Sequence, residues 1–242
     1  MQINPDSMER LVPGQLDAEG ATGAETLELH LDRYRFAARY AVEGRLLDIA
    51  CGAGYGTRFL VDECPGIRAT GVDISPQAID YANERYNADR LTFLSQDAMS
   101  FADTDGFDTI VTLETIEHVA LPEKLIHRLH DLLKPGGVLI SSVPVTPSVD
   151  VNPHHLHDFT PRSFRKLFLS LGLEEIACLS QSQWFNPLAI LNKNETRARD
   201  LRPGLDLYYS RNPGSLLKRL VSTVRYGFSN RYLTCAWRNI GR

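Results

Sequence analysis

The feature that most constrains the fold is a cluster of glycines directly after a short apolar run. The run 45–50 (RLLDIA) has the composition of a buried strand, and Gly52, Gly54 and Gly56 follow it before a helical pattern begins. Glycines permit a sharp turn from strand to helix, and they let backbone N–H groups approach a ligand closely. We therefore expect a parallel sheet with a ligand beyond the carboxyl ends of its strands.

The same order of strand and helix continues along the chain. Short β-rich runs indicate strands, whereas apolar residues at helical spacing, with Ser or Thr caps and an early proline, indicate helices. The predicted strands are 45–50, 69–73, 91–95, 107–113, 138–143, 173–179 and, at the sheet edge, 232–237; the predicted helices are 26–40, 57–62, 76–86, 122–133, 160–171 and 215–228. This order predicts an α/β fold with a Rossmann-like, doubly wound sheet.

Charge is distributed unevenly between two parts of the chain. The 242 residues carry a net charge of −4, but residues 197–242 hold ten Lys and Arg against two Asp, and the rest has a net charge of −12. An acidic body disfavours broad contact with nucleic acid. We predict an N-terminal helical lid (1–41), a ligand-binding Rossmann-like domain (42–181), and an insertion for substrate or oligomer contacts (182–242) that returns a closing strand to the same domain. Residues 181–230 are expected to be rich in loops.

The cysteines and the chain start bear on the compartment. Four cysteines are scattered without a C-x-x-C pair, so we expect neither a zinc framework nor a disulfide scaffold. No apolar run approaches the roughly 20 residues that span a bilayer, and the first residues lack the features of a secretion signal. The expected location is the reducing cytoplasm.

Three acidic residues lie at or near the ends of the first three strands. Asp48 stands four residues before Gly52, where a carboxylate faces a ligand cation rather than a pyrophosphate. Asp73 ends the second strand 19 residues after Gly54, the spacing at which an acid accepts both hydroxyls of an adenosine ribose. Asp97 follows the third strand, where an acid can accept a hydrogen bond from an adenine amino group. The residues thus indicate an adenosyl ligand.

Taken as a set, these segments resemble the class I S-adenosylmethionine-dependent methyltransferases. The resemblance rests on LLDIACGAGYG, GVDIS, QDA and the KPGG turn (134–137), and covers about residues 40–180. It implies a seven-stranded sheet and S-adenosylmethionine as cofactor, with its methionine part near Asp48, its ribose on Asp73 and its adenine on Ile74. The cofactor-binding residues expected on this basis are Tyr34, Asp48, Gly52, Gly54, Asp73, Ile74, Asp97, Ala98 and Leu113.

The N-terminal segment resembles methyltransferases that accompany glycan biosynthesis. The resemblance rests on ERLVPG (9–14) and on ELHLDRY (28–34). It favours a position of Tyr34 over the cofactor, and the alternative for Tyr34 is packing within an amphipathic helix.

A second group of polar side chains is expected over the same crevice. Glu114, Glu117 and His118 follow the fourth strand, and His155 lies on the loop after the fifth. Two carboxylates and two imidazoles suit a divalent ion such as Mg²⁺ or Mn²⁺, with open positions for substrate oxygens. The pattern resembles the O-methyltransferases of ubiquinone biosynthesis and the small-RNA 3′-terminal 2′-O-methyltransferases, and implies these four residues as metal ligands. His118 and Glu117 are the predicted catalytic residues, and the alternative is His118 as a lone general base.

These observations predict an O-methyltransferase that acts on a hydroxyl of a small polyhydroxylated acceptor, a saccharide or glycoconjugate, with divalent-metal assistance. One alternative is a quinone or polyphenol O-methyltransferase, and another is a metal-free N- or O-methyltransferase of a natural product. The polar side chains expected in the acceptor pocket argue against a cofactor-binding module without catalysis. The net negative charge of residues 1–196 argues against an RNA-methylating enzyme.

The basic C-terminal segment contains one amphipathic helix. Five apolar residues lie on one face of helix 215–228: Leu216, Leu217, Leu220, Val221 and Val224. This pattern predicts a helix packed on its own domain; the alternative is contact with a membrane surface or an anionic substrate group. Membrane contact is not expected, and a homodimer is left open.

Overall fold

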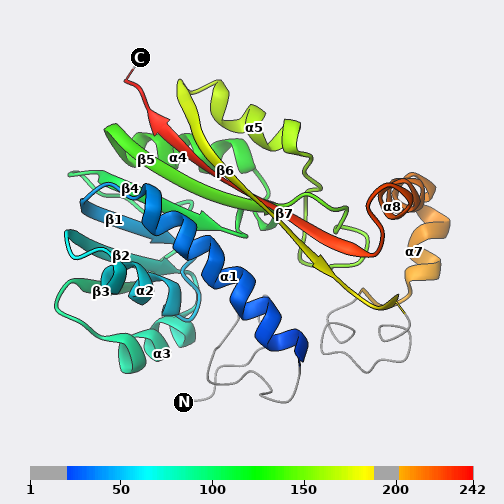
Figure 1. The fold of residues 1–242 in the computed structure, drawn as a ribbon, viewed down its shortest axis with the longest axis horizontal. Helices are drawn as coiled ribbons and strands as arrows, with labels where there is room; N and C mark the ends of the chain where they lie inside the picture. The colour runs from blue at the N-terminus through cyan, green and yellow to red at the C-terminus, as the bar shows by residue number, and fades with distance from the viewer. Residues whose placement is uncertain (1–20, 188–201, 242) are drawn as a thin grey trace.

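The computed structural model describes residues 21–187 and 202–241, and these form a single sheet with helices on both faces. The seven strands are β1 (Gly44–Ile49), β2 (Ile67–Asp73), β3 (Leu91–Ser95), β4 (Phe107–Leu113), β5 (Leu133–Pro144), β6 (Leu173–Trp184) and β7 (Ser229–Asn239). Their order is β3-β2-β1-β4-β5-β7-β6 (Figure 1). The first five strands of this order, from β3 through β2, β1 and β4 to β5, are all parallel to one another. This confirms the predicted doubly wound, Rossmann-like sheet.

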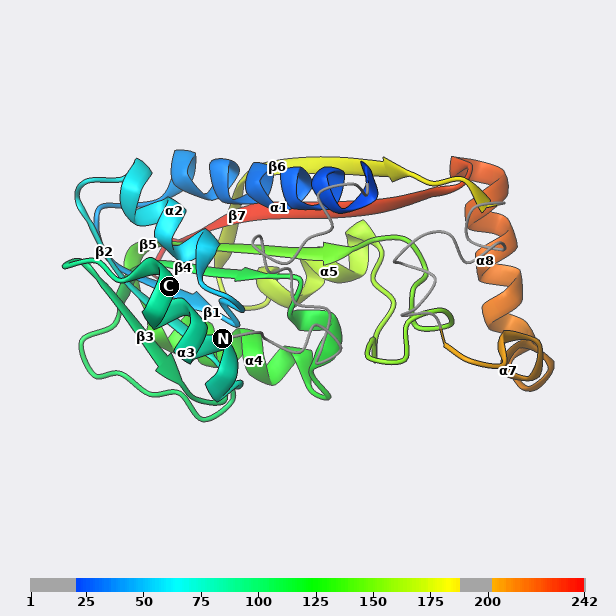
Figure 2. The same ribbon diagram turned by 90° about the horizontal axis from the view of Figure 1, so that it is seen from below.

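The described helices are α1 (Ala21–Tyr40), α2 (Tyr55–Glu63), α3 (Pro76–Tyr86), the short η2 (Ile116–His118), α4 (Pro122–Leu132), α5 (Pro161–Leu169), α7 (Leu205–Arg211) and α8 (Pro213–Tyr226). The sheet is covered on both faces by helices from the part of the chain before α7 (Figures 1 and 2). Figure 2 shows α1 and α2 on one face of the sheet and α4 and α5 on the other. Each face has its own apolar core, one including Phe36 and Leu60 and the other Leu129 and Phe168. None of the described helices is long and apolar enough to cross a membrane.

The position of the last strand corrects the sequence prediction. Strand 232–237 was expected at the sheet edge, but β7 lies between β5 and β6, antiparallel to both, and β6 is the edge strand. Cys235, Ala236 and Trp237 are accordingly fully buried, and Trp237 stacks on Phe168. A strand covered on both faces reads as a continuous apolar run, and this run alone does not reveal its neighbours.

Two further predictions about local structure are wrong. The turn 134–137, expected between helix and strand, is part of β5, which already begins at Leu133. The segment 181–230 was expected to be rich in loops, but its described parts contain the end of β6 and helices α7 and α8; residues 188–201 lie outside the described residues. β6 extends this far because it pairs with β7 over its whole length, up to Trp184 opposite Ser229.

The long pairing of β6 with β7 also brings two cysteines together. Cys178 and Cys235 are direct cross-strand neighbours and form a disulfide, although 57 residues separate them. The scattered cysteines predicted no disulfide scaffold, and this single bridge does not follow from their spacing because it depends on the position of β7. The cytoplasmic location stays a prediction.

Helix α8 does not pack on its domain through the apolar face that was predicted. The five apolar residues of its predicted packing face are all exposed, from 38% for Leu216 to 89% for Val224. Figures 1 and 2 place α7 and α8 at the opposite end of the molecule from α2 and α3. The apolar pattern therefore marks a face of α8 that the described chain does not cover.

Candidate functional site

The site lies at the carboxyl ends of β1 and β4, where the strand order reverses. In doubly wound sheets ligands bind at this switch point. Among the described residues, Ala50 and Glu114 are the non-glycine residues with positive φ, at 61° and 50°. Each directly follows its strand, β1 or β4. Such backbone geometry costs on the order of 1–3 kcal/mol and is concentrated at functional sites.

Asp73 and the glycine turn form the rim on the cofactor side. The Asp73 carboxylate, 5% exposed, accepts hydrogen bonds from Gly52 N at 3.0 Å and from Ser75 N at 2.9 Å. These bonds fix the carboxylate at the end of β2. Gly52 has a φ of +57°, and a Cβ there would meet no atom within 4 Å, so the turn borders unfilled space. A carboxylate has about four lone-pair directions, so Asp73 can accept further bonds from ribose hydroxyls.

Gly54 serves packing rather than open space. A Cβ on this residue would lie 2.6 Å from the Cβ of Ala82 and 2.8 Å from the ring of Phe93. Its φ of +83° also favours glycine. The two predicted glycines therefore differ: Gly52 faces the ligand space, and Gly54 lets α2 lie close to α3 and β3.

Asp48 is buried and bonded within the protein. Its carboxylate, 1% exposed, accepts hydrogen bonds from the Thr57 hydroxyl at 2.6 Å and from the Tyr34 hydroxyl at 3.3 Å. Burial raises the pKa of Asp48 to about 7, although both hydrogen bonds oppose the shift. The structure thus surrounds this predicted cofactor residue with internal donors.

Tyr34 packs in the core beside α2, which agrees with the alternative of packing within an amphipathic helix. It is 5% exposed, and a Cβ on Gly56 would lie only 1.9 Å from its ring. Burial raises the pKa of the Tyr34 hydroxyl well above its ordinary value, and the charge of the neighbouring Asp48 adds to this shift. Its predicted role over the cofactor stays a prediction.

The residues expected around the adenine lie on the same rim. Ile74 is 55% exposed beside Asp73, which gives a large apolar surface at the end of β2. Asp97 is exposed and accepts a hydrogen bond from Met99 N at 2.9 Å. Ala98 packs against the core, and Leu113 is buried at the end of β4. Because Asp73 and Ser95 are paired at the ends of β2 and β3, the predicted cofactor residues that follow these two strands lie at the same edge of the sheet.

The acceptor side brings together three of the four predicted metal ligands. One ligand atom each from Glu117, His118 and His155 lies within 4.8 Å of the others. The two imidazole centroids are 4.7 Å apart, with the rings nearly perpendicular. Glu117 is fully buried in η2, and its carbonyl accepts a hydrogen bond from Leu156 N at 2.8 Å. This backbone bond joins η2 to the loop that carries His155.

Contacts at Nδ1 orient both imidazoles. His118 Nδ1 lies 3.1 Å from the carbonyl oxygen of His154, and His155 Nδ1 lies 2.7 Å from Ser148 Oγ. A carbonyl only accepts, so Nδ1 of His118 donates, and the neutral ring carries its lone pair on Nε2. Such contacts fix the orientation of metal-ligating histidines.

Glu114, predicted as a fourth metal ligand, lies outside this group, and a metal held by the other three residues stays a prediction. Its Oε1 accepts a hydrogen bond from Ser142 Oγ at 2.6 Å and lies 3.8 Å from Arg33 Nη1. The positive φ of Glu114 turns the chain directly after β4, and Ser142 on the neighbouring β5 then holds the carboxylate.

Arg33 is a site residue that the sequence analysis missed. It is 1% exposed on α1, its Nε donates to Gln181 Oε1 at 2.9 Å, and its guanidinium lies 4.3 Å from the Tyr232 ring centroid. Its Nη1 has no hydrogen-bond partner among the described residues. The local signal is an arginine among the apolar residues of a helix, but its partners on β6 and β7 are distant in sequence.

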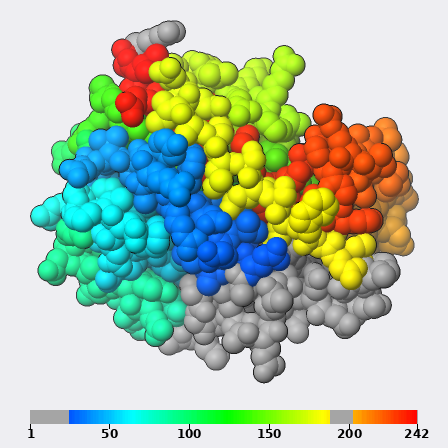
Figure 3. All heavy atoms as spheres, viewed as in Figure 1, coloured from blue at the N-terminus to red at the C-terminus, as the bar shows by residue number. Residues whose placement is uncertain are grey.

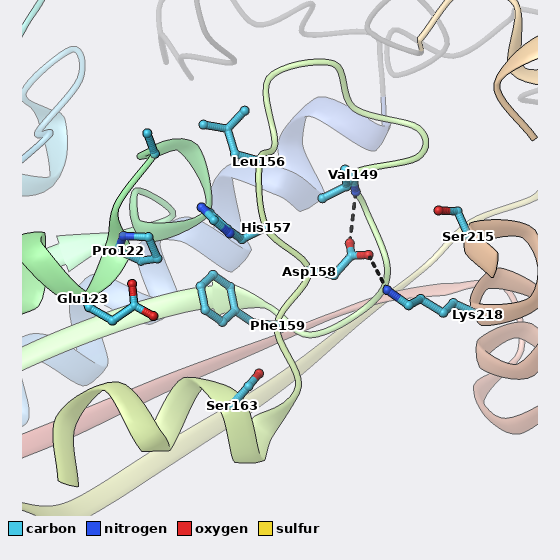
Figure 4. A pocket seen from close by; sticks show the side chains of 11 residues that line it. Pro122, Glu123, Val149, Leu156, His157, Asp158, Phe159, Ser163, Ser215 and Lys218 are labelled. Carbon is cyan, nitrogen blue, oxygen red and sulfur yellow. Dashed lines mark hydrogen bonds and ion pairs between the residues drawn. The ribbon is translucent and has the colours of Figure 1, made fainter. Parts of the chain in front are cut away.

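A separate hollow borders the loop that carries His155. It has a volume of about 410 Å³ and lies between the start of α4, the loop and α8 (Figure 4). Asp158 accepts a hydrogen bond from Val149 N and pairs with Lys218 of α8. His157 lines this hollow, with its Nε2 3.0 Å from Val119 O. His157 is thus not a member of the Glu117–His118–His155 group.

Comparison with known proteins finds similarity to methyltransferases. Residues 47–139 match the family described as "Methyltransferase domain". Malonyl-[acyl-carrier protein] O-methyltransferase of Paenibacillus sp. is 27% identical over 159 residues, which cover 62% of this chain and 55% of that protein. Ubiquinone biosynthesis O-methyltransferase of Xanthomonas campestris pv. campestris is 26% identical over 183 residues, which cover 66% of this chain and 76% of that protein. A second malonyl-[acyl-carrier protein] O-methyltransferase, from Acetivibrio thermocellus, is matched over only 34% of its length.

Among solved structures, the N-methyltransferase NodS of Bradyrhizobium japonicum, in complex with S-adenosyl-L-homocysteine, has the same fold. The TM-score is 0.59 at 18% identity, over 94% of this chain and 91% of that one. The fold, the matched domain and the rim described above all agree with the resemblance seen in the sequence.

Proposed function

Residues 47–139 match the methyltransferase domain family, and we propose that this chain is a class I S-adenosylmethionine-dependent methyltransferase that transfers a methyl group to a hydroxyl of a small acceptor with two adjacent oxygens. The observation that carries this proposal is the group Glu117, His118 and His155 on the acceptor side of the crevice. S-Adenosylmethionine supplies an electrophilic methyl group on its sulfonium. Asp73 and Gly52 would hold it, since they combine an anchored carboxylate with unfilled space.

The acceptor hydroxyl needs help because an alcohol is a poor nucleophile at neutral pH. A divalent ion held by Glu117, His118 and His155 would lower the pKa of a bound hydroxyl, so that its proton can pass to water. Nε2 of His118, which carries the lone pair of the neutral ring, would then be a metal ligand. Without an ion, the same atom can instead take the hydroxyl proton as a lone general base. The set is now two nitrogens and one carboxylate, without Glu114. This set favours Mn²⁺ over Mg²⁺, since Mg²⁺ prefers oxygen ligands.

The first candidate acceptor is a saccharide or glycoconjugate. Support comes from the N-terminal resemblance to glycan-associated methyltransferases and from the basic segment after residue 196, which suits an acceptor with a phosphate, uronate or lipid-carrier group. The second candidate is a dihydroxyaryl compound. It is supported by the similarity to the ubiquinone biosynthesis O-methyltransferase, which extends over 66% of this chain.

Removal of the metal tests the proposal at the site itself. We expect a chelator to abolish turnover and added Mn²⁺ to restore it, while the affinity for S-adenosylmethionine changes little. His155→Ala should lower kcat by about 100-fold or more, the usual scale for loss of such catalytic assistance. His157→Ala is the matched control, because His157 lines the separate hollow. Full activity in excess chelator would leave His118 as a lone base.

A substrate series tests the acceptor. A glycoside with two adjacent hydroxyls is compared with analogues that lack the neighbouring hydroxyl, and with a catechol. Loss of the neighbour should lower kcat/KM at least about tenfold, because the chelate to a metal is broken. Equal turnover of the deoxy analogue contradicts the two-oxygen acceptor, and preference for the catechol selects the second candidate.

A further inference from the structure

Helix α8 has an inverted orientation, with polar side chains toward the protein and apolar side chains toward solvent. The side chains on its inner face are partly buried: Ser215, Arg219, Ser222, Thr223 and Tyr226. The outer face carries Leu217, Leu220, Val221 and Val224, which are between 53% and 89% exposed. At 100° per residue these four lie on the side of the helix opposite Arg219. We call this the α8 outer face.

A buried ion pair fixes this orientation. Arg219 pairs with Asp150, which is 2% exposed, through its Nε at 3.0 Å and also through Nη2. The Tyr209 hydroxyl of α7 donates to the same carboxylate at 2.7 Å. A rotation of α8 that covered its apolar side would break this pair and leave Asp150 buried without its cation, which is strongly unfavourable.

Further exposed apolar side chains lie at the same end of the molecule. Phe228, directly after α8, is 46% exposed, and Leu207 of α7 is 53% exposed. Trp184, at the end of β6, is 67% exposed and lies against Gly227, where a Cβ would be 2.8 Å from its ring. In the space-filling view, the orange and red atoms of α7 and α8 form a bulge beyond the yellow atoms of β6 (Figure 3).

The charges next to this face are positive. Lys218 and Arg225 flank the outer face on one side, and both are exposed. Helix α8 contains no acidic residue, and α7 contains only Asp206. Self-pairing through α8 would bring the cations of two copies together, which disfavours a second copy as the occupant. An apolar stripe flanked by cations is the pattern of a helix that lies in the interface of an anionic bilayer.

We propose that α7 and α8 form a docking site for an anionic lipid surface, with the α8 outer face and Phe228 among the acyl chains and with Lys218 and Arg225 at the headgroups. The buried pair of Arg219 and Asp150 holds the helix in the orientation that this contact needs. The proposal does not depend on the identity of the methyl acceptor.

Vesicle flotation of the full chain tests this site. We expect binding to vesicles of phosphatidylcholine with phosphatidylglycerol, weaker binding to phosphatidylcholine alone, and a decrease with salt. The double variant Leu217→Glu/Val224→Glu should bind the anionic vesicles at least about tenfold less, because two apolar side chains no longer enter the bilayer. Lys218→Gln/Arg225→Gln should lose the preference for anionic vesicles.

Leu169→Glu on α5 is the matched control, since Leu169 is also exposed, at 61%, but lies on another helix. Affinity for S-adenosylmethionine reports that each variant is folded. Equal binding of the double variant and the chain itself, or no binding to anionic vesicles, would overturn the proposal. A dimer in solution that the double variant dissociates would assign the face to a second copy instead.

Discussion

The proposed cofactor side and the proposed acceptor side of the site are built in different ways. On the cofactor side, Asp73 is held by the backbone N–H groups of Gly52 and Ser75, all within two consecutive strand–turn units. On the acceptor side, Glu117 and His155 come from two separate segments, η2 and a loop beyond β5, which a backbone hydrogen bond joins. A backbone cradle keeps its shape when side chains change, whereas the acceptor side depends on which residues distant segments supply. The first arrangement suits a constant cofactor, and the second allows the acceptor to differ among relatives.

The largest effect is expected from substitution of one glutamate on the acceptor side. Glu117→Gln should lower kcat by about 100-fold or more, because a neutral amide is a poor metal ligand, and should leave cofactor affinity nearly unchanged. Glu114→Gln should cost less than about tenfold, because a glutamine oxygen can still accept the Ser142 hydrogen bond. Steady-state kinetics with calorimetric cofactor titration separates the two. An equal loss in both variants would return Glu114 to the ligand set.

The next effect is expected on the cofactor side. Asp73→Asn should weaken S-adenosylmethionine binding by about 10- to 100-fold, since a hydrogen bond to a charged group is worth about 1.5–3 kcal/mol. Asp97→Asn should have a smaller effect, because that carboxylate is exposed and screened by water. Calorimetry that gave the same affinity for Asp73→Asn and the unchanged chain would remove Asp73 from the ribose site.

A separate effect is expected on stability rather than on activity, at the buried carboxylate of Asp48. Asp48 holds its proton in the folded state up to about pH 7, whereas the unfolded chain releases it near 3.8. The unfolding free energy should therefore fall as pH rises across this range and level off above it, by at most about 4 kcal/mol, since one pKa unit corresponds to about 1.4 kcal/mol. Asp48→Asn should flatten this dependence in denaturant titrations. The same slope in both proteins would show that Asp48 is ionised throughout.

The same difference explains what could be predicted from the sequence. Helix α3 and strands β3 and β4 have the predicted bounds, because caps, prolines and apolar runs act locally. The rim around Asp73 follows from the same local signals. The contacts of Glu114 with Ser142 and of Arg33 with Gln181 join residues 28 and 148 positions apart, and no local pattern records them.

Helix α8 shows the limit of periodicity in another way. Its apolar spacing was read correctly as amphipathic, but periodicity does not tell which side faces the protein. That choice is made by one tertiary contact, the pair of Arg219 with Asp150. A buried ion pair can therefore reverse the usual orientation of an amphipathic helix.

The position of β7 has a consequence for what completes the sheet. Domains generally fold as units. β7 is the last of the seven strands in chain order, yet it pairs with both β5 and β6. Without residues 229–239, β5 would end the sheet with an unpaired edge, and β6 would have no strand to join. Cys178 likewise needs Cys235, so this one strand completes both the sheet and the disulfide.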